Sequence, residues 1–214
     1  MHIANGLIGR ILRSVVLTSF AVLVSVGPAI CQQAPIQLPK PEIKGWMPLM
    51  QALSLRQTSR EFADRPMPTQ TLSNLLWAAF GVNRPRTVKP GLGRTAPSGM
   101  NKQEVALYVV LADGAYVYEA EQNQLRPVAS GDVRVKVAQG AGAHAAVTII
   151  YVADAKQDMA QVDTGFIGQN VYLFAASEGL NAWFYALHGA DVAGALKLPE
   201  GQKALYGQSV GYRP

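Results

Sequence analysis

Two arginines and two hydroxyl residues stand together in the segment Arg56-Gln57-Thr58-Ser59-Arg60. A guanidinium is a planar fork of donors that can bind two oxygens of one phosphate. Arginines four residues apart lie on one face of a helix, and donors near a helix start favour an anion. The segment therefore suits a dianion such as a phosphate, bound on a helix. Considered alone, however, an arginine-rich turn is more often a solvated helix start than a phosphate site.

A second polar cluster lies between Arg94 and Gln103, directly before a strongly apolar stretch. It combines the hydroxyl of Ser98, the amide of Asn101 and the glycine Gly99. Glycine allows backbone to approach a ligand closely, because it has no side chain. The loop is therefore expected to bring short polar groups against a flat ligand.

A helix is expected over residues 68–80, because its large apolar residues recur at the spacing of one helical face. Gly81 is expected to end this helix in the left-handed conformation. The following residues, 82–99, are rich in Gly, Pro and Arg and are expected to form a long loop of a functional or mobile kind.

Further strands and helices alternate along the rest of the chain. The expected elements are a hairpin of residues 105–112 and 115–118 turning at Asp113-Gly114, a buried central strand at 146–153, a helix at 163–179 closed by Gly179, and strands at 181–187 and 208–212. A hairpin excludes a purely parallel sheet, so the expected fold class is α+β.

The N-terminal residues have the pattern of a secretory signal peptide. Arg10 and Arg13 precede an apolar run that ends at Ile30, and the run is shorter than the ~20 residues of a membrane-spanning helix. We expect residues 1–31 to be removed, residues 32–48 to form a flexible mature N terminus, and the protein to be exported, in the periplasm. The alternatives are a lipoprotein acylated at Cys31 and an uncleaved membrane anchor.

Composition excludes several classes of function for the mature chain. Without Arg10 and Arg13, 17 of the 19 basic residues remain against 14 acidic residues, a net charge of +3 that does not suggest a nucleic-acid partner. Removal of Cys31 leaves no cysteine for disulfides, thiolate catalysis or metal binding. Only His144 and His188 remain as imidazoles, which makes a metal cluster improbable. No stable membrane span is expected in the mature chain.

The spacing of the first cluster resembles a motif of the nitroreductase family. In that family an Arg, a Ser or Thr, an Arg or Lys and a Phe alternate with arbitrary residues, and Arg56, Thr58, Arg60 and Phe62 fall on this pattern. The family also has a Pro-Ser-x-x-Asn-x-Gln loop, a helix between the two motifs, and a glycine after a strand end. Pro97, Ser98, Asn101 and Gln103 match the fixed positions of the loop. Residues 75–81 match the helix, and His188-Gly189, within residues 183–191, stands at the place of the glycine after the strand.

The resemblance covers Arg56 to Pro214, and residues 75–81 look most like the branch of dehydrogenases acting on peptide-derived azoline rings. It implies an FMN-binding domain over residues 49–214, an α+β flavin sandwich with an antiparallel-rich mixed sheet, and a homodimer with FMN between the subunits. The residues that it assigns to FMN are Arg56, Gln57, Thr58, Arg60, Pro97, Ser98, Gly99, Asn101, His188, Gly189 and Arg213.

Individual roles also follow from the resemblance. Arg56 and Thr58 would hold the phosphate and ribityl end, and Arg60 would reach toward the ring. Ser98 and Asn101 would contact FMN across the subunit interface, and the backbone amides of residues 188 and 189 would face the ring edge. No catalytic side chain is required, because the cofactor performs the redox chemistry.

The expected function is two-electron transfer to or from a conjugated small molecule, such as a nitroaromatic, a quinone or a ring substrate. NAD(P)H would be a transient electron donor. An exported protein should meet little reduced nicotinamide, so an oxidase or dehydrogenase that discharges to oxygen or a quinone fits that compartment better. The alternative is a flavin- or ligand-binding module on the same fold that performs no catalysis.

Overall fold

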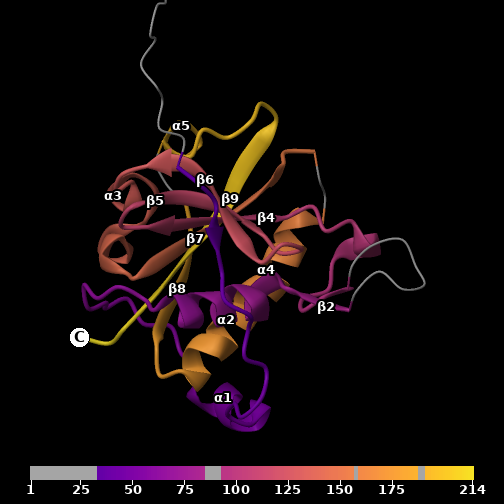
Figure 1. Ribbon diagram of the computed structural model, residues 1–214, viewed down its shortest axis with the longest axis vertical. Coiled ribbons are helices and arrows are strands. Elements are labelled where there is room, and N and C mark those ends of the chain that lie inside the picture. The colour runs from indigo at the N-terminus through magenta and orange to yellow at the C-terminus, as the bar shows by residue number, and fades with distance from the viewer. Residues whose placement is uncertain (1–32, 85–92, 157–158, 188–190) are drawn as a thin grey trace, which may run out of the picture. The chain divides into compact units, whose positions relative to one another are not determined.

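The strand β7 (Val147–Asp154) is an interior strand of a seven-stranded sheet in the computed structural model, which describes residues 33–84, 93–156, 159–187 and 191–214 (Figure 1). The strand order is β1-β6-β5-β4-β7-β9-β8, and every described pair is antiparallel. The other strands are β1 (Ile36–Gln37), β4 (Ala106–Leu111), β5 (Gly114–Glu119), β6 (Gln124–Ser130), β8 (Asn181–Ala186) and β9 (Gln202–Gly211). The α+β class is confirmed.

Both faces of the sheet are buried, which explains the nearly continuous apolar sequence of β7. Alternate residues of a strand point to opposite faces. Ile149 and Tyr151 belong to the core under the long helices, whereas Ile150 and Val152 belong to a second core on the other face. The hairpin β4–β5 turns at Ala112-Asp113, one residue earlier than expected, because Leu111 pairs with Gly114.

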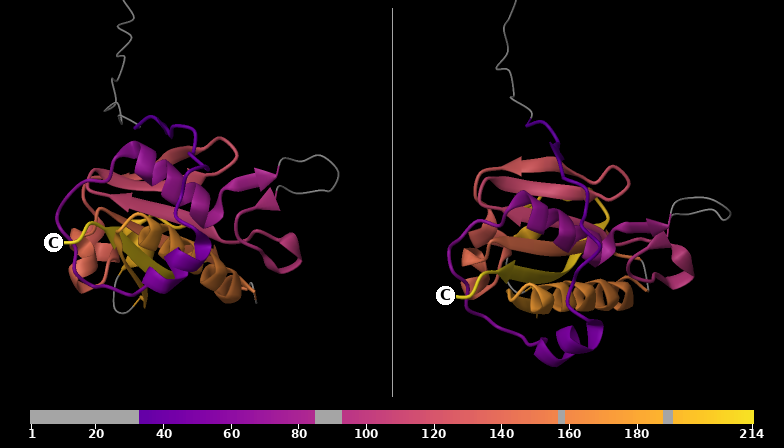
Figure 2. Two further views of the ribbon diagram at one scale, coloured as in Figure 1. Left: turned by 90° about the horizontal axis from the view of Figure 1, so that it is seen from below. Right: turned by 60° about the horizontal axis from the view of Figure 1, so that its bottom comes forward.

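The first face is covered by α2 (Thr69–Phe80) and α4 (Ala160–Ser177), with α1 (Leu49–Leu55) packed against α4 (Figure 2). The large apolar residues of α2 are buried, as their spacing predicts. Gly179 ends α4 at a φ of +67°, also as expected. Among the described residues, no helix combines the length and apolarity needed to cross a bilayer.

Gly81 differs from the prediction, because its φ is −69° and its backbone is extended. Its role is steric instead. A Cβ at Gly81 would lie 2.6 Å from the Trp77 carbonyl oxygen, a distance that real side chains do not reach. A glycine is needed here for close approach and not for left-handed geometry.

The segment that follows Gly81 is more ordered than the expected loop. β2 (Val82–Arg84) and β3 (Gly93–Arg94) pair into a small separate sheet.

The segment that begins at Gln33 belongs to the same folded unit as the rest of the described chain. There β1 pairs with β6, and Leu38 is 3% exposed in the main core. These contacts join residues that are far apart in the sequence, so the local sequence pattern could not predict them.

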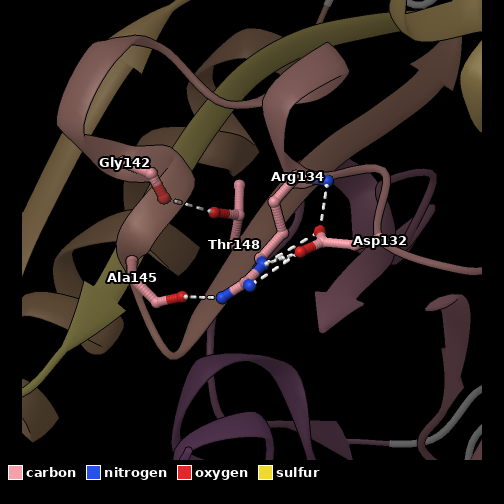
Figure 3. Close-up of polar contacts among 5 residues, drawn as sticks. All are labelled: Asp132, Arg134, Gly142, Ala145 and Thr148. Atoms are coloured by element: carbon pink, nitrogen blue, oxygen red, sulfur yellow. Dashed lines mark hydrogen bonds and ion pairs between the residues drawn. The ribbon is translucent and has the colours of Figure 1, made fainter. Parts of the chain in front are cut away.

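The second face is covered by α3 (Arg134–Val137), the 3-10 turn η2 (Gly140–His144) and α5 (Val192–Ala195). Figure 3 shows how polar contacts hold this cover. Arg134 pairs with Asp132 at 2.7 Å and donates to the Ala145 carbonyl at 3.1 Å (Figure 3). The buried Thr148 hydroxyl donates to the Gly142 carbonyl at 3.4 Å. His144, at the end of η2, is exposed.

Candidate functional site

The arginine segment does not lie on a helix, which corrects the sequence interpretation. Helix α1 ends at Leu55, and the Arg56 amide donates the last helical bond, to the Ala52 carbonyl at 2.9 Å. Beyond it, the Ser59 amide donates to the Ala182 carbonyl of β8 at 3.0 Å. The segment therefore runs beside the edge strand β8. The hydrogen bond between Ser59 and Ala182, which are more than a hundred residues apart, fixes the position of the segment. The local sequence could not predict this bond.

Arg56 and Thr58 meet the same tyrosine of α4. The Thr58 hydroxyl lies 2.9 Å from the Tyr172 hydroxyl, and the Arg56 guanidinium carbon lies 5.5 Å from the Tyr172 ring centroid. The Phe184 amide of β8 donates to the same phenol oxygen at 2.9 Å. The phenol proton is then available for Thr58, and the threonine proton can point outward. Tyr172 was not identified as a site residue from the sequence. Its position in an apolar helix gives no signal that distinguishes it from other half-buried residues of that helix.

Arg60 meets a different aromatic ring from Arg56. Its guanidinium carbon is 5.3 Å from the ring centroid of Trp183, a residue of β8. Among the described residues, neither Arg56 nor Arg60 forms an ion pair. One cationic group therefore lies against a ring of α4 and the other against a ring of β8, and neither is neutralised by a carboxylate there.

The second motif forms a tight turn with an unusual backbone. The 3-10 helix η1 spans Gly99–Asn101, and Met100, Asn101 and Gln103 have φ values of 50°, 56° and 53°. Left-handed backbone is unfavourable for residues with a side chain and often occurs at functional sites. Such a turn persists only if its surroundings hold it.

Hydrogen bonds within the loop leave its side chains as donors. The Ser98 hydroxyl oxygen accepts the Gln103 amide at 2.7 Å, and the Asn101 side-chain oxygen accepts the Gln103 side-chain amide at 2.8 Å. The Ser98 proton and the Asn101 NH₂ group donate no bond among the described residues. They suit an acceptor-rich ligand.

Two further residues fix this loop in place. Asp163, 1% exposed in the first turn of α4, accepts the Gly99 amide at 3.0 and 3.3 Å through its two oxygens. Arg94 donates to the Gln103 side-chain oxygen at 2.8 Å and to the Phe80 carbonyl at 3.3 Å. Burial lowers the pKa of the Arg94 guanidinium. The Gly99 amide is therefore engaged in a hydrogen bond within the protein.

The structure brings the two motifs to different places on α4. Asp163 and Tyr172 are nine residues apart on this helix, or about 14 Å along its axis at 1.5 Å per residue. Within one chain, the two motifs therefore lie apart. Pro97 and Arg213 are exposed, and Arg213 follows Tyr212, whose carbonyl accepts the Ala63 amide. His188 and Gly189 lie outside the described residues.

A cavity of about 360 Å³ lies elsewhere, between residues 42–47 and the helices α1, α2 and α4. Its lining contains no residue of either motif and no Lys or Arg. A phosphate has no partner there. The arginine segment beside β8 remains the better anion site, even though it is not a closed cavity in a single chain. The described residues contain no cluster of His, Cys, Asp and Glu that could hold a metal ion.

The donor set fits the phosphate and the oxygen-rich ring of FMN. Two guanidiniums without carboxylate partners suit a dianion, and Thr58, Ser98 and Asn101 offer donors to acceptor atoms. Acidic side chains, which would repel a phosphate, do not line the segment from Arg56 to Arg60 among its described contacts.

Comparisons with known proteins agree with the fold and the motifs. The model of the nitroreductase family matches residues 53–212. A protein of Methanocaldococcus jannaschii named as a nitroreductase is 29% identical over 186 residues, covering 77% of this chain and 90% of its own. A Ralstonia eutropha crystal structure titled as a nitroreductase superposes with a TM-score of 0.76 at 30% identity, covering 86% of this chain and 91% of its own.

A Parabacteroides distasonis structure, titled an NADH dehydrogenase/NAD(P)H nitroreductase, shares the fold with a TM-score of 0.54 at 19% identity, over 77% of this chain and 86% of its own. The family match spans both motifs and the strand and helix that position the first of them. The chain therefore belongs to the nitroreductase family of oxidoreductases.

Proposed function

We propose that the protein is an FMN-dependent oxidoreductase that transfers two electrons to or from a conjugated small molecule. The observation that supports this most directly is the arginine segment beside β8. Arg56 and Arg60 are both held against aromatic rings, and neither is neutralised by a carboxylate among the described residues. Both guanidiniums therefore retain N–H donors of the kind that suits a phosphate.

Each residue has a defined task in this proposal. Arg56 and Thr58 bind the phosphate, with Arg213 as a further cation, and Arg60 lies toward the ring. Ser98 and Asn101 donate hydrogen bonds to FMN, and the backbone amides of residues 188 and 189 face the ring edge. The bound FMN supplies the redox chemistry, while the protein orients it and excludes water.

We further propose a homodimer built on α4. A stripe on this helix contains the exposed Val162, Phe166 and Gln169 and the half-buried Leu173, at intervals of four, three and four residues, and Val162 and Phe166 are 47% and 44% exposed. This spacing is typical of a seam between two helices. Gly165 lies beside the seam, and nothing lies within 4 Å of a Cβ built there, so a second helix can approach closely.

A two-fold axis near Gln169 would complete the site. Asp163 and Ala175 are both six residues from Gln169, so the partner's Asp163 would lie opposite Ala175 in an antiparallel pair. That position is three residues, or about 4.5 Å along the helix, from Tyr172. The partner's loop of residues 97–103, which its Asp163 anchors, would then reach the neighbourhood of Arg56 and Thr58. The two motifs, from different chains, would meet.

Candidate electron donors and acceptors are suggested by the titles of related structures and by the proposed signal peptide. The Parabacteroides structure is titled for NADH and NAD(P)H, which makes a reduced nicotinamide one donor to test. We propose export through residues 1–31, and in that case an oxidase or dehydrogenase that discharges to oxygen or a quinone fits better. Oxidation of an azoline ring, as in the branch that residues 75–81 resemble, belongs to this class.

Flavin binding is the first test. Purified protein should show the absorbance of bound FMN or take up FMN on reconstitution, and a screen of donors and acceptors should reduce and reoxidise it. Protein that binds FMN but is never turned over would favour a binding module. Protein that cannot be loaded with FMN would exclude the proposal.

The phosphate assignment can be tested with a matched pair of arginine variants. Arg56→Ala removes a charge-assisted bond worth ~1.5–3 kcal/mol, or roughly a ten- to hundredfold loss of FMN affinity. Arg65→Ala is the control, because Arg65 also stacks on a tyrosine, at 4.1 Å from the Tyr212 ring centroid, but lies outside the motif. Equal affinity of the two variants would contradict the assignment.

The dimer can be tested by crosslinking. Cys31 is the only cysteine, so Gln169→Cys combined with Cys31→Ser places one thiol near the proposed axis. Oxidation should give a disulfide-linked dimer, whereas a thiol placed at Glu200, exposed and far along the chain, should not react in this way. Export is tested separately, since full-length protein with Met1 retained in the cytoplasm would contradict it.

A further inference from the structure

The cavity of about 360 Å³ between residues 42–47 and the helices α1, α2 and α4 has walls suited to one kind of ligand. Its volume lies in the range of small-molecule sites. Three aromatic residues line it, namely Trp46, Trp77 and Phe174. Trp46 and Phe174 lie 5.6 Å apart between ring centroids, at an interplanar angle of 50°.

Both indoles are fixed by hydrogen bonds that use their only donors. The Trp46 N–H donates to the Glu42 carbonyl at 2.7 Å, and the Trp77 N–H donates to the Val82 carbonyl at 3.1 Å. Because both donors are already used, the two side chains contribute aromatic carbon to the lining and no free N–H group. Aromatic rings attract cations through the ring quadrupole.

The charge around the cavity has the matching sign. Glu42 is the only charged residue of the lining, which contains no Lys, Arg or His. Glu178 follows the lining residue Ser177, and burial together with the charge of Glu42 raises the pKa of the Glu178 carboxyl. Lys40 and Lys44 flank Glu42 in sequence but do not line the cavity. The cavity thus combines aromatic faces with negative potential.

Two amide side chains of the cavity lining are engaged in hydrogen bonds, whereas the buried Thr95 hydroxyl of the lining has no partner among the described residues. The Asn74 side-chain oxygen accepts the Glu42 amide at 2.9 Å and the Gln70 side-chain amide at 3.0 Å, and the Asn170 NH₂ group donates to the Ala79 carbonyl at 3.4 Å. These bonds hold residues 42–46 against α2 and give the cavity a preformed wall. A ligand would not need many hydrogen bonds of its own.

We propose that this cavity is a second small-molecule site, separate from the arginine segment, that binds a small organic cation with an apolar or aromatic body. Trp46 and Trp77 contact the cationic group, and Glu42 supplies the opposite charge at the rim. The binding needs neither FMN nor turnover, although Leu173 of the proposed dimer seam also lines the cavity.

The test compares two ligands of the same shape. Benzyltrimethylammonium and its uncharged isostere neopentylbenzene are titrated into purified protein, with and without FMN, by calorimetry and by tryptophan fluorescence. The chain has three tryptophans, so Trp183→Phe leaves Trp46 and Trp77 as the reporters. The cation should bind about two- to thirtyfold more tightly than the isostere and should change the fluorescence.

Variants locate the site and test its chemistry. Ala78→Phe fills the cavity and should abolish binding, and Trp46→Ala removes one ring of the lining, at a partly buried residue on the margin of the core. Glu42→Gln should weaken cation binding, whereas Glu200→Gln, an exposed carboxylate outside the cavity, should not. Equal binding of the two ligands, absence of binding, or binding that survives Ala78→Phe and Trp46→Ala would overturn the proposal. Blocking of the cavity by a second copy of the chain would appear as absence of binding.

Discussion

Asp163 holds the loop of residues 97–103, and removing its carboxylate should release that loop. Asp163 is 1% exposed, and its two oxygens accept the Gly99 amide at 3.0 and 3.3 Å. The loop has three left-handed residues with side chains, each of which costs roughly 1–3 kcal/mol. A strained loop of this kind needs its anchors, and Asp163 is the one that joins it to α4.

The magnitude follows from the type of bond. A hydrogen bond to a charged group is worth about 1.5–3 kcal/mol, which corresponds to roughly a ten- to hundredfold change in the population of the open loop. Asp163→Ala removes the acceptor and should raise this population accordingly. Asp163→Asn keeps an amide oxygen as acceptor and should restore part of the effect, since a neutral bond is worth about 0.5–1.5 kcal/mol.

Hydrogen exchange of the amides of residues 98–103 measures the opening directly. Thr164→Val is the matched control, because Thr164 is buried in the same helical turn and its hydroxyl donates only within α4, to the Ala160 carbonyl at 2.7 Å. If Asp163→Ala leaves the exchange unchanged, or if Thr164→Val accelerates it as much, the anchoring role is refuted. FMN affinity, measured on the same variants, then shows whether the loop acts on cofactor binding.

Three further predictions concern stability and are checked by urea unfolding. Leu75→Ala should lower the unfolding free energy by about 2–5 kcal/mol, because Leu75 is 0% exposed between α2 and the sheet. Gly81→Ala should also destabilise, since its Cβ would meet the Trp77 backbone 2.6 Å from the carbonyl oxygen; an unchanged midpoint would contradict the steric role. The hydrogen bond from Arg134 lowers the pKa of Asp132, so its stabilisation is present above the ordinary value of 3.8 and is lost as pH falls through the lowered pKa. Asp132→Asn should therefore cost less than about 1 kcal/mol at neutral pH, at this largely exposed site, and the difference should vanish in strong acid.

Sequence periodicity predicted the elements that pack by local pattern. Helix α2, the β4–β5 hairpin, the strand β7 and the helix α4 all appear where apolar spacing places them. Gly179 ends α4 in the expected left-handed conformation. These features depend on residues within a few positions of one another, so the linear sequence contains the information that determines them.

The residue types of the two motifs were also readable, but their geometry was not. The segment from Arg56 to Arg60 was expected on a helix and instead runs beside β8, because the Ser59 amide bonds to Ala182. Gly81 was expected to be left-handed and is extended, because Trp77 folds against it. In both cases a tertiary contact outweighed a weak local preference.

By itself, then, the sequence determined the α+β class, the main helices and strands, and the residue types that make an anion site. Only the tertiary structure decided that Tyr172 joins Arg56 to Thr58, that Asp163 anchors the second motif, and that the two motifs lie apart on α4. The physical reason is that these contacts connect positions separated by 64 to 116 residues. Their partners become neighbours only after the sheet and α4 have packed together.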